Sequence, residues 1–223
     1  MRQLVIGLGQ IGSAVQSILG CDGVDKDLSD HQHYDVIHVA IPYTEEFDRW
    51  MEEYIYRYTP DLIVVHSTVA PGTCEKFGAV HSPARGRHPN LEPGIRTFTK
   101  FFGGPKAKKA AQLFKEKGIP VATTEKSITT ELGKLFDTEQ YREAIEVMRN
   151  IKQLCDEYGA DFDVTYKAFN KTYNEGYEKL GEPQFKKYVL DYIPGPTGGH
   201  CVNPNHKILE DHGISLRTYT GEK

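Results

Sequence analysis

A glycine-rich turn between a strand and a helix constrains the fold of this sequence more than any other feature. The apolar run Leu4–Ile6 predicts a short strand, and apolar residues at helical spacing over Ile11–Leu19 predict a helix. Gly7, Gly9 and Gly12 lie between them in the spacing G-x-G-x-x-G. In such a turn the first glycine permits the tight bend, the second lets a pyrophosphate approach the backbone, and the third allows close packing of helix on strand. The sequence therefore predicts the first βα unit of a dinucleotide-binding fold.

The same alternation of strands and helices continues to about residue 124. Further strands are expected at Val36–Ile41, Asp61–Val65, Ala79–His81, Thr97–Phe102 and Ile119–Ala122, with helical stretches between most of them. Strands that are separated by helices form right-handed crossovers and a mostly parallel sheet. We therefore predict an α/β fold with a doubly wound Rossmann-type sheet over residues 1–124.

Residues 125–223 have a different, helical pattern. A long apolar stripe over Ser127–Tyr158 predicts one helix, and an aromatic-rich stretch over Val164–Leu180 predicts another. We expect the aromatic residues of the second helix to fill a seam between helices; they are Tyr166, Phe169, Tyr173 and Tyr177. The first helix has more apolar surface than so small a domain can cover, so we predict a homodimer. This part is expected to be a smaller all-helical domain that ends in a cysteine-containing loop.

Charge and hydropathy exclude several classes of partner. The chain has 27 Lys+Arg against 31 Asp+Glu, a net charge of −4, which argues against a nucleic-acid-binding protein. Mean hydropathy is −0.51 and no long apolar run occurs, so no membrane segment is expected. The sequence passes from Met1 directly into a strand, which does not resemble a secretory signal. We expect a cytoplasmic protein.

The cysteines and histidines do not have the spacing of a metal site. The four cysteines are scattered and lack C-x-x-C spacing, so we interpret them as reduced thiols; they are Cys21, Cys74, Cys155 and Cys201. His200, His206 and His212 lie near Cys201 but do not form a compact zinc motif. We therefore predict no metal.

An acid at the end of the predicted second strand favours one cofactor. Asp25 follows Val24 and is placed to accept hydrogen bonds from the adenosine ribose, and its charge repels the extra phosphate of NADP. The adjacent Lys26 weakens that preference. Gln10 and Ile11 complete the phosphate-binding turn at the start of the helix. NAD is the expected cofactor, although the same features also fit S-adenosylmethionine.

Five further segments resemble those of the UDP-glucose/GDP-mannose/UDP-N-acetylmannosamine 6-dehydrogenases, in the same order along the chain. They are residues 38–44 (HVAIPYT), 65–73 (VHSTVAPGT), 81–85 (HSPAR), 131–136 (ELGKLF) and 198–205 (GGHCVNPN). The resemblance implies a dinucleotide-binding domain followed by a helical domain, with the active site in the cleft between them. It also implies that the nicotinamide side of the cofactor is bound by Ile41, Pro42, Tyr43, Ser67 and Thr68.

The resemblance also implies a cysteine-assisted oxidation. Carried over position by position, Cys201 is the nucleophile, Lys134 stabilises the oxyanion, and Thr68 orients a water molecule or the substrate hydroxyl. The residue types suit this chemistry, because a thiolate adds to an aldehyde and the resulting oxyanion needs a cation beside it.

This sequence departs from the family pattern at several proton-handling positions. Ala84 and His88 replace two family glutamates, Thr138 replaces an asparagine, and Asn205 replaces an aspartate. The sequence also ends at Lys223, where the family's second, nucleotide-binding domain is expected to begin. For these reasons the nucleotide-sugar substrate is not carried over.

Basic residues after Ser82 predict a different substrate. Arg85 and Arg87 lie in the loop expected to border the nicotinamide, where a guanidinium could bind a carboxylate or phosphate, and His88 is a candidate general base. Later basic residues such as Lys100 fit a solvated face equally well. We also assign Thr138, His200 and Asn205 to the substrate side.

The expected function is an NAD-dependent oxidoreductase for a small anionic alcohol or its aldehyde or ketone. A non-catalytic NAD-responsive protein and an S-adenosylmethionine-dependent group-transfer enzyme remain alternatives.

Overall fold

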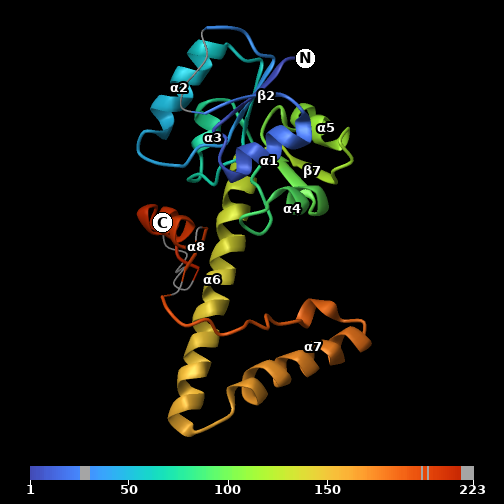
Figure 1. The fold of residues 1–223 in the computed structure, drawn as a ribbon, viewed down its shortest axis with the longest axis vertical. Coiled ribbons are helices and arrows are strands. Elements are labelled where there is room, and N and C mark those ends of the chain that lie inside the picture. Colours follow the sequence, from blue (N-terminus) through green and yellow to red (C-terminus); the bar gives the residue numbers. More distant parts are fainter. Residues whose placement is uncertain (26–30, 197, 200, 217–223) are drawn as a thin grey trace. The chain divides into compact units, whose positions relative to one another are not determined.

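A computed structural model of the chain describes residues 1–25, 31–196, 198–199 and 201–216 (Figure 1). The chain divides into two compact units, Met1–Leu135 and Phe136–Lys223. Two of the predicted site residues, Lys26 and His200, lie outside the described residues.

The first unit is built on a seven-stranded sheet. Its strands are β1 (Gln3–Ile6), β2 (Asp22–Val24), β3 (Val36–Val39), β4 (Leu62–Val65), β5 (Val80–His81), β6 (Lys100–Gly103) and β7 (Val121–Thr124). They are arranged in the order β2-β1-β3-β4-β5-β6-β7, and every neighbouring pair is parallel except β5 and β6. The predicted mostly parallel Rossmann-type sheet is confirmed.

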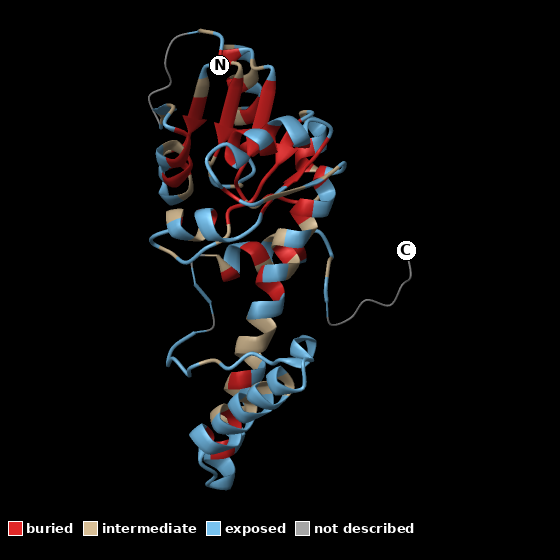
Figure 2. Cartoon of the chain, turned by 90° about the vertical axis from the view of Figure 1, so that its right-hand side faces the viewer, coloured by how far each residue is buried: buried red, intermediate tan, exposed pale blue. Residues whose placement is uncertain are grey.

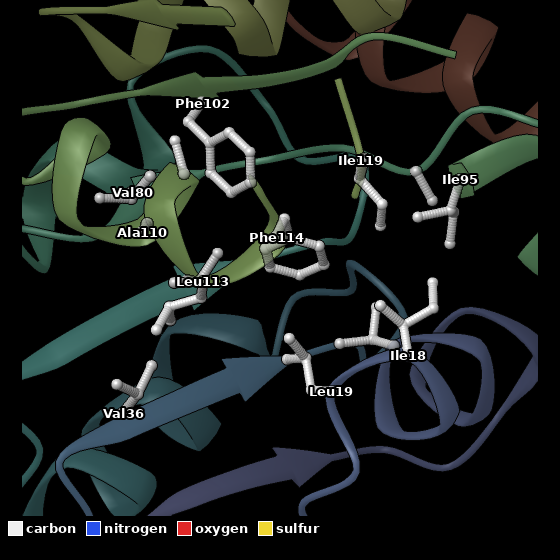
Figure 3. Close-up of a cluster of buried hydrophobic side chains, with 14 of the residues drawn as sticks. Ile18, Leu19, Val36, Val80, Ile95, Phe102, Ala110, Leu113, Phe114 and Ile119 are labelled. Carbon is white, nitrogen blue, oxygen red and sulfur yellow. The ribbon is translucent and has the colours of Figure 1, made fainter. Parts of the chain in front are cut away.

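Helices cover both faces of this sheet, as a doubly wound fold requires. The helices of this unit are α1 (Gln10–Leu19), α2 (Phe47–Tyr58), α3 (Thr73–Lys76), α4 (Glu92–Thr97) and α5 (Ala107–Lys115). Successive residues of a strand point to opposite faces. Val36 accordingly packs in one buried cluster with residues of α1, α4 and α5 (Figure 3), and Ile37 packs in a second cluster with residues of α2.

The prediction of a strand over Thr97–Phe102 is wrong in its first half. Helix α4 ends at Thr97, and β6 begins only at Lys100. Pro93 lies in the first turn of α4, where a proline needs no hydrogen-bond partner for its nitrogen. Arg96 forms an ion pair with Glu92 one turn earlier, and Ile95 is buried in the core.

Helix α6 (Ser127–Tyr158) has the predicted bounds, and its first turns belong to the first unit. The second unit also contains a π-helical turn (Asp163–Ala168), α7 (Phe169–Lys179), a short 3-10 turn (Pro183–Phe185) and α8 (Val202–Asp211). Its small core consists of Met148, Cys155, Phe162 and Tyr166. Much of α7 is exposed (Figure 2).

The predicted aromatic seam is correct only in part. Tyr166 is buried, but Phe169 is 69% exposed. Tyr173 and Tyr177 pack against each other and, through Tyr177, against Phe185 rather than against another long helix. No helix among the described residues is long and apolar enough to cross a membrane.

Candidate active site

The glycine-rich turn has the backbone that the motif predicts. Gly7 has a φ of +89°, and a Cβ atom there would lie 2.8 Å from the carbonyl oxygen of Ala40. A Cβ atom on Gly12 would overlap the carbonyl oxygen of Gly7, so only glycine lets α1 pack so closely on the turn. At Gly9, the residue that caps α1, the same test finds no atom within 4 Å. The turn is therefore closed on its inner side and open at Gly9.

Asp25 lies beside this turn, immediately after β2. Its Oδ1 atom accepts a hydrogen bond from the backbone N–H of Leu8 at 3.1 Å. The neighbouring Val24 carbonyl accepts a second one from the N–H of Gly7 at 2.9 Å. These bonds hold an exposed carboxylate next to the glycine-rich turn, and its Oδ2 atom has no hydrogen-bond partner among the described residues.

The loop after β5 also reaches the glycine-rich turn. The ring of His88 forms a hydrogen bond with the side chain of Gln10, the first residue of α1. The guanidinium of Arg85 lies over the ring of Phe98, 5.4 Å from its centre, and Arg87 is exposed. His88, which the sequence assigned to the substrate side, thus contacts the turn where phosphate groups are expected.

The carboxyl ends of β3, β4 and β5 are joined by hydrogen bonds. The hydroxyl of Ser67 donates to the carbonyl of Ile41, and the Nε2 atom of His81 lies 3.1 Å from the carbonyl oxygen of Ser67. Thr68 is half-buried beside them. Three of the family-like segments are therefore in direct contact at the carboxyl-terminal edge of the sheet, where its parallel strands end.

Sequence reasoning missed the structural role of Glu131 and Thr130, which join a fourth segment to this edge. The fully buried carboxylate of Glu131 accepts hydrogen bonds from the backbone N–H groups of Gly72, at 2.6 Å, and Cys74, at 2.9 Å. Thr130 Oγ1 lies 2.9 Å from Nδ1 of His81. The only signal in the sequence is the E-L-G-K-L segment, in which the family resemblance assigns a role to the lysine and not to the glutamate.

A row of buried polar side chains crosses the core behind this edge. Nδ1 of His38 lies 3.0 Å from Nε2 of His66, whose Nδ1 lies 2.8 Å from the carbonyl oxygen of Ser82. Because a carbonyl can only accept, His66 carries its proton on Nδ1, and His38 donates to His66. Burial lowers the pKa of His38 to about 3 and that of His66 well below its usual value, so both rings are neutral at pH 7.

Lys100 belongs to this buried group and not to a solvated basic face. Its side chain donates to the carbonyl oxygen of Ser82 at 2.9 Å, and it lies near the rings of Phe102 and Phe114. No carboxylate among the described residues forms an ion pair with it. Burial lowers the pKa of Lys100 to about 7. Its bond to Ser82 fixes the start of the loop that carries Arg85 and His88.

In the second unit, Cys201 is the residue that caps the N-terminus of α8. The predicted cysteine loop thus continues into a helix, and Asn205 lies one turn into it. The amide of Asn205 donates to the hydroxyl of Thr138 on α6 at 3.0 Å. Next to this pair, Nδ1 of His206 lies 3.0 Å from Oε2 of Glu139. Cys201 is partly exposed.

The other cysteines have surroundings that disfavour reactivity. None of the four cysteines forms a disulfide bond. Burial and the neighbouring Asp22 raise the pKa of Cys21 to about 11, and burial raises that of Cys74 well above its usual value. Cys155 is part of the core of the second unit.

Among the described residues, one group of metal-ligating side chains comes together, and it is not the set near Cys201. It consists of His33, Asp35 and Asp61 at the surface. Asp35 already accepts a hydrogen bond from the backbone of Arg2. Exposed groups of this kind occur commonly without a metal.

No protein-family model matches the chain, and no curated protein matches it. Solved structures do. The UDP-D-ManNAc dehydrogenase of Pyrococcus horikoshii superimposes with a TM-score of 0.72 at 16% identity, over 97% of this chain and 66% of that one. A UDP-glucose dehydrogenase of Pyrobaculum islandicum superimposes with a TM-score of 0.68 at 16% identity, over 96% of this chain and 65% of that one. This chain has the fold of the nucleotide-sugar dehydrogenases.

The resemblance drawn from the sequence motifs is thereby confirmed at the level of the fold. The chain spans about two thirds of the length of these nucleotide-sugar dehydrogenases. A second kind of neighbour matches along nearly its whole length. The 3-hydroxyisobutyrate dehydrogenase of Mycobacterium tuberculosis superimposes with a TM-score of 0.58 at 13% identity, over 95% of both chains.

Proposed function

We propose that this chain is an NAD-dependent oxidoreductase that acts on a small alcohol, or its aldehyde or ketone, with an anionic group. The observation that carries the proposal is the glycine-rich turn, which is open at Gly9 and bordered by Asp25. It lies at the carboxyl end of β1, between β2 and β3, where the order of the strands reverses. Ligands of open α/β sheets bind at this kind of position.

The residues present fit a dinucleotide. A side chain at position 9 would fill the space that a pyrophosphate needs, and the first backbone N–H groups of α1 point toward it. The carboxylate of Asp25 suits the adenosine ribose and disfavours the extra phosphate of NADP. Ile41, Pro42, Tyr43, Ser67 and Thr68 would border the nicotinamide. NAD, when bound, supplies the hydride acceptor.

Cys201 and Lys134 are proposed to act at the reacting carbon. The thiolate of Cys201 would add to the aldehyde carbon, and the ammonium of Lys134 would stabilise the oxyanion that this addition forms. Cys201 is partly exposed at the N-terminus of α8, as a nucleophilic thiol must be, and Asn205, one turn later, is bonded to Thr138.

The anionic group of the substrate is assigned to Arg85 and Arg87, since a guanidinium binds a carboxylate or phosphate with two parallel hydrogen bonds. One structural neighbour, a 3-hydroxyisobutyrate dehydrogenase, is named for a substrate of this class, a small hydroxy acid. In that role Arg87, which is exposed, would meet the substrate first.

We also propose that the second unit forms a homodimer. Several large apolar side chains of α6 and α7 are more than a third exposed, and they include Val147, Leu154, Tyr158 and Phe169. Large exposed apolar side chains are typical of subunit interfaces when they form a patch. Light scattering at micromolar concentration is expected to give twice the mass of the chain, and a monomer would contradict the proposal.

Calorimetry with NAD, NADP and S-adenosylmethionine tests the cofactor assignment. NAD is expected to bind at least tenfold more tightly than NADP. Tight binding of S-adenosylmethionine alone would replace the proposal with a group-transfer enzyme.

NADH formation should then be followed with a panel of hydroxy acids, phosphorylated alcohols and their aldehydes. Cys201→Ser is expected to keep NAD affinity and to lose turnover. Unchanged turnover in that variant would remove Cys201 from the mechanism.

A further inference from the structure

His81, the last residue of β5, contacts two segments that have different proposed roles. Its Nε2 atom lies 3.1 Å from the carbonyl oxygen of Ser67, and its Nδ1 atom lies 2.9 Å from Oγ1 of Thr130 on α6. Ser67 belongs to the segment that would border the nicotinamide, whereas Thr130 precedes Lys134 by one turn of α6. The imidazole ring is therefore a direct link between the proposed cofactor side and the helix of the proposed catalytic lysine.

Both ring nitrogens of His81 have defined partners. Because a carbonyl oxygen only accepts, Nε2 carries a proton and donates to Ser67. Nδ1 then faces the hydroxyl of Thr130, whose proton is shared between the ring and the carbonyl oxygen of Ser127, at 2.9 Å. His81 is fully buried, and Ser67 and Thr130 are each about 5% exposed. Water therefore does not compete for either bond of the ring.

A glycine makes room for the contact between the ring and α6. Gly103 on β6 pairs with His81 across the antiparallel neighbours β5 and β6. A Cβ atom at Gly103 would lie 2.6 Å from Oγ1 of Thr130 and 2.7 Å from the carbonyl oxygen of Lys126. A larger residue there would displace the start of α6 from the sheet. Glycine thus lets α6 approach β5 closely enough for Thr130 to reach the ring.

Lys134 lies close to the same ring. Burial lowers the pKa of His81 to about 3, and the charges of Lys100 and Lys134 lower it further. Thr130 and Lys134 share one side of α6, because residues four positions apart lie above each other on a helix. A shift of the first turns of α6 relative to Ser67 would therefore move the Lys134 ammonium relative to the segment that would border the nicotinamide.

We infer that His81 is a positioning residue that sets where Lys134 lies relative to the segment at Ser67 and Thr68. The inference rests on the function proposed above. When a cofactor packs against that segment, the two bonds of His81 restrain the first turns of α6 as well. Glu131 binds the same turns to the backbone of residues 72–74, so α6 stays attached when the bond to Thr130 is removed.

Amide hydrogen exchange of the full-length chain, with and without NAD, tests this coupling without a substrate. In the wild type, NAD is expected to raise protection about threefold or more both at residues 9–15 and at residues 130–135. Thr130→Val, which is nearly isosteric and lacks the hydroxyl, should keep the response at 9–15 and lose most of it at 130–135. Thr130→Ser keeps the hydroxyl and should respond like the wild type. Thr129→Val, at the exposed neighbouring position, is the matched control and should do the same.

The outcomes separate this inference from the cofactor assignment. Equal responses at residues 130–135 in Thr130→Val and Thr130→Ser would overturn the inference. A wild-type response at residues 9–15 without one at 130–135 would also overturn it and would leave NAD as the cofactor. A wild-type chain that responds to NAD at neither place would overturn both.

Two replacements of His81 break the two halves of the link separately. The amide of His81→Gln reaches the Nε2 position and can donate to Ser67, whereas the amide oxygen of His81→Asn takes the Nδ1 position and can accept from Thr130. Each variant loses one buried hydrogen bond, so similar losses of stability are expected. Neither variant joins the two segments, so the exchange response of α6 to NAD should be lost in both.

Kinetics with a substrate from the panel above adds a readout that a merely structural role would not move. Turnover should fall about tenfold or more in both variants, because Lys134 is no longer held relative to Ser67. KM for NAD should rise only in His81→Asn, which releases Ser67. A KM for NAD that rises equally in both variants, or wild-type turnover in either, would overturn the inference.

Discussion

The buried carboxylate of Glu131 accepts a hydrogen bond from the backbone N–H of Cys74, 57 positions earlier in the sequence. A second bond, from Gly72, occupies its other oxygen. The first turns of α6 are thereby fixed to the segment that begins α3. Four of the segments that resemble the dehydrogenase family meet at this edge of the sheet through Glu131, His81 and Ser67.

Glu131→Ala is expected to lower the free energy of unfolding by about 3 kcal/mol, because it leaves the buried N–H of Cys74 and the partly buried N–H of Gly72 without their acceptor. Urea denaturation measures this change. Glu125→Ala, at an exposed position shortly before α6, is the matched control and should change stability by less than about 0.5 kcal/mol. Equal effects of the two substitutions would show that the bonds to Gly72 and Cys74 contribute little.

Alanine at position 12 is expected to lower stability, whereas alanine at position 9 is expected to lower NAD affinity. In Gly12→Ala the new Cβ atom overlaps the Gly7 carbonyl, so stability should fall by at least ~2 kcal/mol. In Gly9→Ala the Cβ atom meets open space, so the melting temperature should be unchanged while NAD affinity falls at least tenfold. Gly133→Ala, also in open space but within α6, controls for the general effect of the substitution. Normal NAD affinity in Gly9→Ala would place the cofactor elsewhere.

Lys100 should make the stability of the chain depend on pH above neutrality. Its pKa is about 7 in the folded protein against 10.5 for an ordinary lysine, so the folded state disfavours the charged form. The unfolded chain binds the proton between these values and the folded chain does not, so the free energy of unfolding rises with pH from about 7 to 10.5. The rise is on the order of 5 kcal/mol.

The comparison with Lys100→Met isolates this contribution, because tyrosines and thiols also titrate in that range. The variant should lack most of the rise, and it should be no less stable than the wild type at pH 7 despite losing the bond to Ser82. Parallel pH curves for the two proteins would mean that Lys100 is hydrated and titrates normally.

Three buried histidines should destabilise the fold in acid. Burial lowers the pKa of His38 and of His81 to about 3, and that of His66 well below 6.5. Their neutral forms stabilise the fold above pH 6.5, and this stability is lost as the pH falls from 6.5 toward 3. Urea titrations at several pH values should show a shallower loss in His38→Gln than in the wild type. The exposed His31→Gln should reproduce the wild-type curve.

The sequence was sufficient for features that depend on local pattern. Helix α6 was predicted with its bounds because its apolar stripe persists over many turns, and the turn at Gly7 was recognised because strand, glycines and helix follow one another. The missed helices α4 and α8 each carry a proline in the first turn, Pro93 and Pro204, which favours a loop interpretation although proline is tolerated there.

Features that depend on distant partners could not be predicted. The sequence does not distinguish Lys100 from several surface cations. Only the folded chain shows that its ammonium donates to the Ser82 carbonyl and lies near the rings of Phe102 and Phe114. The contact of His88 with Gln10 joins residues 78 positions apart. It brings the ring of His88 against the glycine-rich turn, a contact that the sequence does not indicate. Neither contact has a signature in the residues adjacent to it.

The attachment of Glu131 to Gly72 and Cys74 also decides where the first unit can be cut out for separate expression. A fragment that stops at residue 124, the end of the last strand, discards the acceptor and keeps its two donors. A fragment that extends through Leu135 retains both halves of the contact, together with the bond between Thr130 and His81. The longer fragment is therefore the one to produce for calorimetry and crystallisation of the isolated module.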